Sequence, residues 1–262
     1  MRNEPADLRE PRGRGLERRR AISDVRFETI ARRFAALTRL SQTELDLLHR
    51  IGAGPANIWP ARSLLEAPGE DQEATRYIIS GWAARVRELQ DGRRQLVQVI
   101  LPGDALTPTL QVRQRQQMIQ CLTMVQTVDG AAVKLAARDG GKFPGIAAAT
   151  ELAAAHDRAL LMEQITRLGR HTAYERMANL FLELHHRCNV VGLVHADGFI
   201  FPLTQESLGD LLGLSVVHVN RTLQLMRREG VIELKHGRLT LLDTEALKPA
   251  AEFRPPSLAY LG

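Results

Sequence analysis

One segment of this chain, Ser215–Met226, gathers an arginine, two amide side chains, a histidine and two adjacent valines. Arg221 can place two donors on the O6 and N7 atoms of guanine, and Asn220 can pair with adenine. Two neighbouring valines are apolar and could contact only thymine methyl groups. Ser215 and His218 are better placed to contact phosphates. The predicted base-reading residues are Val216, Val217, Asn220, Arg221 and Gln224. For any one of them the alternative is a solvated surface residue, and for the two valines it is packing against another helix.

A helix-turn-helix would position these side chains. Thr204 can cap a first helix, because its hydroxyl can accept from a free N–H of the first turn. Gly213 would end that helix, since glycine tolerates left-handed backbone angles. Ser215 would cap a second helix, whose inward face is expected to be Val219, Leu223 and Met226. The opposite face of this second helix would then be free to enter a major groove.

A hairpin is expected directly after the helix-turn-helix. The apolar runs Val231–Leu234 and Leu239–Leu242 flank a basic turn that contains glycine. We interpret this hairpin as the wing of a winged helix. Lys235 and Arg238 could reach phosphates there, and together with Thr204 they complete the predicted DNA-contacting set.

A long helix with two apolar sides is predicted over 146–168, which contains no proline. One face carries Leu152, Ala155, Ala159 and Met162, and another carries Leu161, Ile165 and Leu168. A helix that is apolar on two sides must bury both of them. One side could pack on the chain's own sheet domain, and the other would suit a second copy, with Leu152, Ala155, Ala159 and Met162 as the dimerisation set. The alternative is a buried helix in a monomer.

Short apolar runs separated by Gly and Pro over 51–142 are typical of a β-barrel or jelly roll. Asp91–Gly92, between Ala83–Leu89 and Gln95–Leu101, is a hairpin signal. Residues 25–50 show helical spacing. A second helix is expected to start at Ser41, where a glutamate three residues later makes a capping box.

The composition restricts the class of protein. Of the 262 residues, 44% are hydrophobic and 25% charged, which fits one or two packed domains. No run approaches the roughly 18 apolar residues of a membrane helix, and the first residues are not a secretory signal. Two cysteines are too few for a disulfide scaffold. We therefore expect a reduced, cytoplasmic, soluble protein that does not interact with a membrane.

Net charge carries little information here. The first twenty residues hold seven arginines against four acids, and so account for three of the five net positive charges. Residues 1–24 are predicted to be a disordered basic leader, either without a role or touching phosphates.

The chain resembles the Crp/Fnr family of bacterial transcription factors over residues 25–245. The strongest match is Leu203–Gly237, with "LTQESLGDLLGLSVVHVNRTLQLMRREGVIEL", and a second is Tyr77–Asp104, "YIISGWAARVRELQDGRRQLVQVILPGD", which resembles the cyclic-nucleotide-binding-type β-roll. The resemblance implies a homodimer joined by the central helix, a bent and roughly palindromic DNA site, and contact with RNA polymerase.

The sequence departs from two branches of that family. Family members that bind cyclic AMP carry a Gly-Glu pair and, later, an Arg followed by Ser or Thr and then Ala. Asp104–Gln120 has neither pattern, although it contains two arginines, Arg113 and Arg115. No cysteine precedes Cys121, whereas the iron–sulfur branch needs four, several of them near the N-terminus. We therefore expect no cofactor, and the effector is left unassigned.

Histidines and cysteines elsewhere in the chain give weaker signals. A metal site of His185, His186 and Cys188, with His195, is disfavoured because adjacent helical side chains point about 100° apart. Cys188 could be an oxidisable thiol that tunes DNA binding; the alternative is an inert cysteine, since a reactive thiol needs a lowered pKa. His156 interrupts the apolar faces of the central helix and is expected to be a seam residue or a satisfied polar residue rather than a sensor. No nucleophile elbow, paired-carboxylate site or cupin His-x-His pattern was found, so the chain is not expected to be an enzyme.

The predicted fold is α+β: an N-terminal β-roll (jelly-roll) domain, a long central dimerisation helix and a C-terminal winged helix-turn-helix. The predicted segments are the basic leader (1–24), the β-roll domain (25–143), the dimerisation helix (144–168), the winged helix-turn-helix domain (169–247) and a C-terminal tail (248–262). The predicted function is a homodimeric, sequence-specific DNA-binding transcription regulator. The alternative is a small-molecule or redox sensor that signals through a protein partner and has a vestigial DNA-binding domain.

Overall fold

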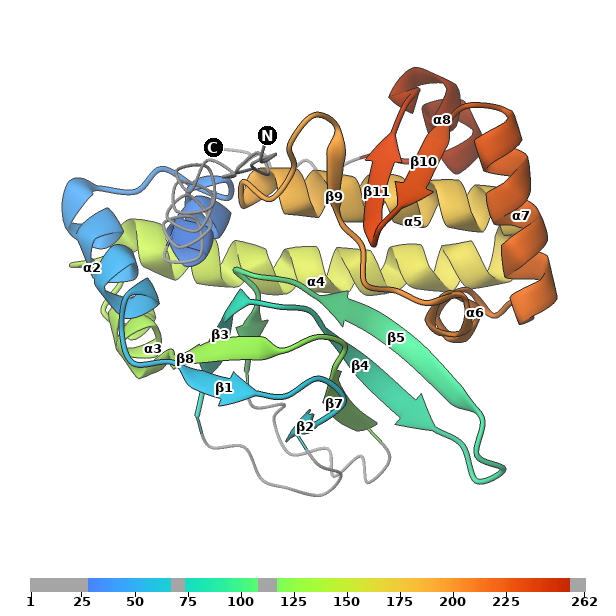
Figure 1. Ribbon diagram of the computed structural model, residues 1–262. Helices are drawn as coiled ribbons and strands as arrows, with labels where there is room; N and C mark the ends of the chain where they lie inside the picture. Colours follow the sequence, from blue (N-terminus) through green and yellow to red (C-terminus); the bar gives the residue numbers. More distant parts are fainter. Residues whose placement is uncertain (1–27, 67–73, 108–116, 255–262) are drawn as a thin grey trace, which may run out of the picture.

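A 27-residue helix, α4 (Pro144–Arg170), joins a sheet domain to a second domain of helices and a small sheet in the computed structural model (Figure 1). The structure describes residues 28–66, 74–107 and 117–254. The predicted leader, residues 1–24, lies outside the described residues, as do Arg113 and Arg115. The predicted α+β class and order of parts are confirmed.

Two antiparallel sheets form the N-terminal roll. The first has the strand order β1-β8-β3-β6 and the second β2-β7-β4-β5. Their bounds are β1 Asn57–Trp59, β2 Leu64–Glu66, β3 Arg76–Ser80, β4 Ala83–Glu88, β5 Arg94–Ile100, β6 Ala105–Leu106, β7 Gln117–Cys121 and β8 Val125–Asp129. The predicted hairpin joins β4 to β5, and Gly92 supplies the positive φ of its turn (+81°).

Alternation along β3 shows how the roll is built. Successive strand side chains point to opposite faces. Ile78 therefore enters the roll interior, whereas Tyr77 and Ile79 pack under the N-terminal helices. The interior is filled by apolar side chains: Leu65, Ile78, Ala83, Ile100, Leu106, Ile119, Cys121 and Val125.

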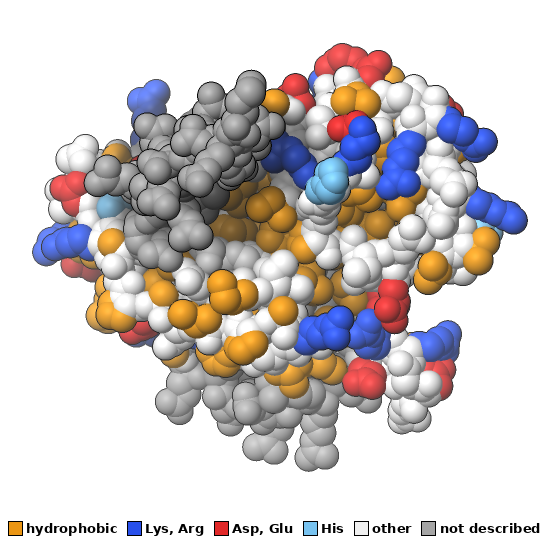
Figure 2. Space-filling model, in the orientation of Figure 1, with side chains coloured by type: hydrophobic (Ala, Val, Ile, Leu, Met, Phe, Trp, Pro, Cys, Tyr) orange, Lys and Arg blue, Asp and Glu red, His pale blue; other side chains and the backbone are white. Residues whose placement is uncertain are grey.

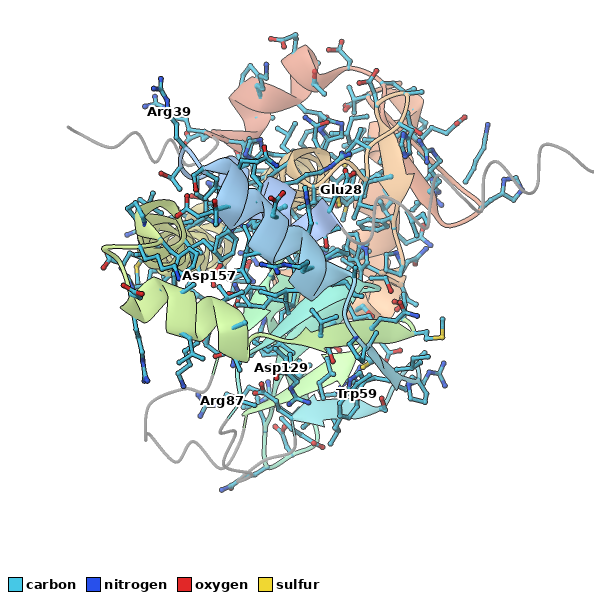
Figure 3. The ribbon with its side chains drawn as sticks, turned by 90° about the vertical axis from the view of Figure 1, so that its left-hand side faces the viewer. Glu28, Arg39, Trp59, Arg87, Asp129 and Asp157 are labelled. Atoms are coloured by element: carbon cyan, nitrogen blue, oxygen red, sulfur yellow. The ribbon has the colours of Figure 1, made fainter. Side chains whose placement is uncertain are left out.

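Helices cover one end of the roll. They are the helical residues 28–35, α2 (Gln42–Gly52) and α3 (Ala131–Arg138). Figure 3 shows this end, with α2 and α3 in front and Asp129 at the end of β8. The predicted capping box at the start of α2 is confirmed, since Ser41 Oγ accepts from the Glu44 N–H and Glu44 accepts from the Ser41 N–H.

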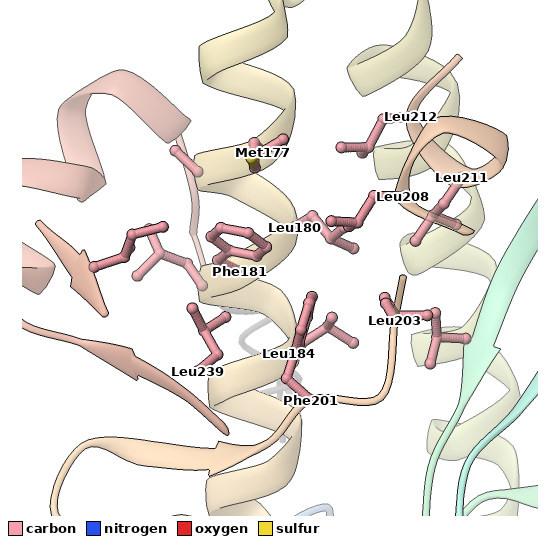
Figure 4. Close-up of a cluster of buried hydrophobic side chains, with 14 of the residues drawn as sticks. Met177, Leu180, Phe181, Leu184, Phe201, Leu203, Leu208, Leu211, Leu212 and Leu239 are labelled. Atoms are coloured by element: carbon pink, nitrogen blue, oxygen red, sulfur yellow. The ribbon is translucent and has the colours of Figure 1, made fainter. Parts of the chain in front are cut away.

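The C-terminal domain contains α5 (Ala173–Val190), α6 (Gln205–Leu212), α7 (Val216–Arg228) and α8 (Thr244–Ala251). A three-stranded sheet completes it, with the order β10 (Ile232–Lys235), β11 (Arg238–Leu241), β9 (Gly198–Ile200). Its core includes Leu180, Phe181, Leu208, Leu211 and Leu239 (Figure 4).

Two predicted boundaries are wrong. The central helix was expected to end at 168, but it continues through Gly169 to Arg170. The expected tail from residue 248 begins inside α8, whose Leu247 and Ala251 are buried in the domain core. The third wing strand, β9, was also not expected.

The two domains share one apolar cluster. Trp82, at the start of β4, stacks on Phe199 with ring centroids 6.2 Å apart and meets Phe201 edge-on at 6.4 Å. Val86 and Leu96 of the β4–β5 hairpin belong to the same buried cluster as Leu208 and Leu211 of α6. The outer face of the roll thus packs directly on the C-terminal domain. No helix in the described part of the chain is long and apolar enough to cross a membrane.

Candidate DNA-binding surface

The first helix of the helix-turn-helix, α6, forms as expected. Thr204 is its N-cap and accepts from the Ser207 N–H at 3.1 Å. Gly213 ends it in the left-handed conformation (φ 63°). Gly209 is needed for the turn that follows, because a Cβ there would lie 2.7 Å from the backbone oxygen of Leu214.

The second helix, α7, starts at its predicted cap. Ser215 Oγ accepts from the His218 N–H at 3.3 Å. The expected inward face, Val219, Leu223 and Met226, is buried. Thr222 is also buried, and its hydroxyl donates to the His218 carbonyl oxygen at 2.9 Å. These contacts fix the rotation of α7, and therefore which of its residues face outward.

The outward face carries the predicted reading residues. Val216 is 48% exposed and Val217 60%, so both present apolar surface to solvent. His218, Arg221 and Gln224 are exposed, and Asn220 is half-buried. Figure 2 shows Lys and Arg side chains gathered over α7 and the wing on the right of the molecule. The structure thus brings an arginine, two amides and two valines together on one accessible helix face.

The two basic residues of the wing are held differently. Lys235 is exposed, and its Nζ lies 2.5 Å from Glu233 Oε1. Arg238 is turned inward: its guanidinium donates to the carbonyl oxygens of His195 and Gly198, the latter at 2.7 Å. Ala196 and Asp197, between these carbonyls, have positive φ angles. Arg238 therefore holds the tight turn before β9, and its phosphate contact stays a prediction.

The predicted dimerisation residues lie on an open side of α4. Leu152, Ala155 and Ala159 are half-buried, and Met162 is 63% exposed. Of the second predicted face, Leu161 and Leu168 are half-buried and Ile165 is exposed. The side that packs within the protomer is a third stripe, which sequence reasoning missed because much of it is polar: Ile146, Ala149, His156, Leu160, Gln164 and Arg167.

Buried ion pairs explain the polar stripe. Arg167 Nη2 lies 2.5 Å from Glu183 Oε2, and the other oxygen of Glu183 lies 3.1 Å from Arg187. Arg187 also pairs with Asp104, on the loop after β5, at 2.6 Å. Buried charges persist only when paired. The network therefore ties α4, α5 and the roll to one another.

His156 is a satisfied polar residue, as expected. Its Nδ1 lies 2.9 Å from Arg33 Nη2. Burial, and then the charge of Arg33, lowers the pKa of His156 to about 3. The ring is therefore neutral, and Nδ1 accepts the hydrogen bond from the guanidinium.

The two cysteines are buried. Burial raises the pKa of the Cys188 thiol to about 12, which removes the thiolate that oxidation requires. His185 packs its ring near Phe199 and His186 near Phe253, rather than toward a common centre. The described residues include no group of three His, Cys, Asp or Glu side chains that could hold a metal ion.

Comparison with known proteins supports the same interpretation. A family model described as a Crp-like helix-turn-helix domain matches residues 175–250. The nitrogen fixation regulation protein FixK of Azorhizobium caulinodans is 31% identical over 183 residues, covering 69% of this chain and 73% of FixK. The transcriptional activator protein FnrL of Cereibacter sphaeroides is 28% identical, covering 78% and 82%.

Solved structures show the same fold. FixK2 from Bradyrhizobium japonicum superposes with a TM-score of 0.62 at 23% identity, covering 75% of this chain and 96% of FixK2. A CooA mutant from Carboxydothermus hydrogenoformans gives 0.59 at 18% identity, covering 82% and 99%. At these identities the likeness concerns the fold alone.

Proposed function

Since the chain belongs to the Crp/Fnr family of transcription regulators, we propose that the exposed face of α7 reads the bases of its operator. The family comprises DNA-binding regulators and not enzymes. The observation that carries the proposal is an accessible helix face with Arg221 and Gln224 exposed, on a helix whose opposite side is fully buried. Such a helix can enter a major groove without any change in the domain.

Each reading residue has a role that follows from its chemistry. Arg221 donates to guanine O6 and N7, and Asn220 and Gln224 pair with adenine. The methyl groups of Val216 and Val217 cover thymine methyl groups. At the start of the recognition helix the cyclic-AMP receptor has an Arg-Glu pair, and this chain has Val216–Val217 at the corresponding positions. We therefore expect its operator sequence to differ from that of the receptor.

Phosphate contacts would flank the reading face. Thr204 and Ser215 lie at the N-termini of α6 and α7, where free N–H groups and the helix dipole favour an anion. His218 in the first turn of α7 and Lys235 on the wing are exposed as well. Phosphate contacts from these groups would position the helix in the groove, but they would not distinguish one base from another.

A homodimer would present two such faces. The half-exposed stripe Leu152, Ala155, Ala159 and Met162, with Ile165 next to it, would pack against the same stripe of a second copy. Closed two-fold pairing buries the same patch on both partners. We propose that RNA polymerase is the further partner at the promoter and that the protein acts in the cytoplasm.

Selection of bound duplexes from a random pool tests the function. The wild-type protein is expected to enrich a palindrome with a guanine in each half-site, and its affinity is expected to fall steeply with salt because phosphate contacts release counterions. The alternative, a sensor with a vestigial DNA-binding domain, predicts no enriched sequence and a shallow dependence on salt. That result would remove DNA reading from this chain.

A further inference from the structure

The C-terminal end of α6 is held by three other elements of the protein. The last four carbonyls of a helix have no partner within it. In α6 these belong to Gly209, Asp210, Leu211 and Leu212. The Gly209 oxygen accepts from the Gly213 and Leu214 N–H groups of the turn itself. The other three accept from side chains outside the helix-turn-helix.

Each of these three carbonyls has a donor from a different element. The Nε2 atom of Gln95, on β5 of the roll, donates to the Asp210 oxygen at 2.7 Å. The Nε2 atom of Gln164, on α4, donates to the Leu211 oxygen at 2.7 Å. Arg176, on α5, donates to the Leu212 oxygen at 2.8 Å. We refer to Gln95, Gln164 and Arg176 as the α6 clamp.

Neighbouring contacts strengthen the attachment to the roll. Arg94 pairs with the Asp210 carboxylate at 2.9 Å and approaches Glu206 at 4.0 Å. Leu208 and Leu211 of α6 share a buried cluster with Val86 and Leu96 of the β4–β5 hairpin. In Figure 1, β5 passes directly beneath α6.

The clamp is also connected to the buried ion network. Arg167 donates to Gln164 Oε1 at 2.5 Å, which fixes the orientation of the Gln164 amide. Arg167 is held in turn by Asn179 and Glu183. Through Arg187 the network reaches Asp104 in the roll. The roll therefore touches α6 directly through Gln95 and indirectly through Gln164.

We propose that the clamp sets the position of the helix-turn-helix for DNA binding, and that Gln95 is the positioning residue through which the roll controls DNA affinity. Two recognition helices must lie one turn of DNA apart. A helix held in that position binds with a smaller loss of freedom than one that swings. Gln95 contacts no DNA in this proposal, which rests on the proposed function but concerns affinity and not base choice.

The experiment compares full-length Gln95→Ala and Gln95→Glu with wild type. We expect operator affinity to fall about five- to twenty-fold, the effect of losing about one well-placed hydrogen bond. The base preference and the slope of affinity against salt should not change, because no base or phosphate contact is touched. Thermal midpoints are measured in parallel to show that the variants are folded.

The glutamate variant adds a readout that a general loss of packing would not give. A carboxylate cannot donate to the Asp210 carbonyl, whereas a protonated carboxyl group can. The affinity of Gln95→Glu, relative to wild type, should therefore recover as the pH is lowered toward the ordinary glutamate pKa of about 4.3, and that of Gln95→Ala should not.

Adjacent arginines provide a matched control for the hairpin. Arg94→Ala removes the ion pair with Asp210, whereas Arg93→Ala removes the same charge from a residue that pairs with Asp91 within its own turn. Arg94→Ala should weaken operator binding modestly and Arg93→Ala should leave it unchanged. Equal losses in both would attribute the effect to charge and contradict the proposal.

Hydrogen exchange without DNA separates this proposal from the proposed function. The amides of residues 205–214 should exchange faster in Gln95→Ala than in wild type or Arg93→Ala. Unchanged exchange there, or operator affinity equal to or above that of wild type, would overturn the clamp. If wild type selects no DNA sequence, the proposed function fails, and the exchange result still decides whether Gln95 holds α6.

Discussion

Arg221 carries the sharpest prediction at the scale of single residues. Arg221 is exposed on the outward face of α7, so its guanidinium is accessible to a base. Arg221→Ala should cost about 1–3 kcal/mol of binding free energy on the selected operator and relax one base position. Binding to variant operators measures this. Arg228→Ala, at the far end of α7, is the control. It should leave the base preference unchanged and can alter only the dependence of affinity on salt.

Val217 gives a second prediction, on the thymine methyl group. Its side chain is 60% exposed on the reading face, although exposure of an apolar side chain is unfavourable in the free protein. Replacing the contacted thymine by deoxyuridine should weaken binding by about 0.8 kcal/mol, the value of one buried methyl group. Val217→Ala should remove most of that difference. If both proteins lose the same amount, Val217 does not contact the methyl group.

Local signals determined what could be predicted for individual residues. Capping by Thr204 and Ser215 depends on neighbours three residues away, so the sequence was sufficient. The inward turn of Arg238 depends on carbonyls about forty residues away, at His195 and Gly198, and no local pattern encodes it. For the same reason Gln95 gave no signal.

At the scale of helices and strands, Glu44 joins two elements. Its carboxylate caps α2 through the Ser41 N–H and also accepts from the Ile146 N–H in the first turn of α4, at 3.0 Å. Phe143, the N-cap of α4, offers no side-chain acceptor. Burial would raise the pKa of Glu44, but the hydrogen bonds from Ser41 and Ile146 outweigh it and lower the pKa below its ordinary value.

The stability of the protein should therefore depend on Glu44 ionisation. A lowered folded-state pKa means stability that is present above the ordinary glutamate pKa and lost as pH falls through the folded value. Glu44→Gln should lower the free energy of unfolding by about 1–2 kcal/mol at neutral pH, and the difference from wild type should shrink in acid. Denaturant unfolding at several pH values measures it. Asp46→Asn, exposed on the same helix, should have no such effect.

The central helix shows why patterns of apolar residues were an incomplete guide to elements. Its buried stripe includes His156, Gln164 and Arg167, which are polar, because Glu183 and Arg33 supply partners from other elements. Hydrophobic spacing cannot identify a face whose burial depends on distant charges. Proline and glycine spacing did predict the roll, since turns are encoded locally.

At the scale of the whole molecule, the order of parts followed from the sequence, but their packing did not. The roll, the long helix and the winged helix were each expected as separate units. The contact of Trp82 with Phe199 and Phe201, which merges two domain cores, joins residues more than a hundred positions apart. Aromatic residues carry no local sign of their partners.

The open side of α4 gives the prediction for the assembly. Met162 is 63% exposed at the C-terminal end of the proposed dimerisation stripe. Met162→Glu would place two carboxylates against each other and against apolar side chains, so the dimer should dissociate at micromolar concentration in sedimentation. Operator affinity should fall by about 10² or more, because a monomer loses the gain from binding two linked half-sites.

An exposed leucine elsewhere supplies the control for that experiment. Leu135, on α3, is 65% exposed, and Leu135→Glu makes a comparable change far from the stripe. It should leave both mass and affinity unchanged.

Two-fold pairing also fixes the separation of the recognition helices at about one turn of DNA. Inserting about five base pairs between half-sites should therefore abolish wild-type binding by placing them on opposite sides of the duplex. Met162→Glu, already limited to one half-site, should bind both spacings equally. If Met162→Glu remains a dimer and still distinguishes the two spacings, the interface lies on another face of the molecule.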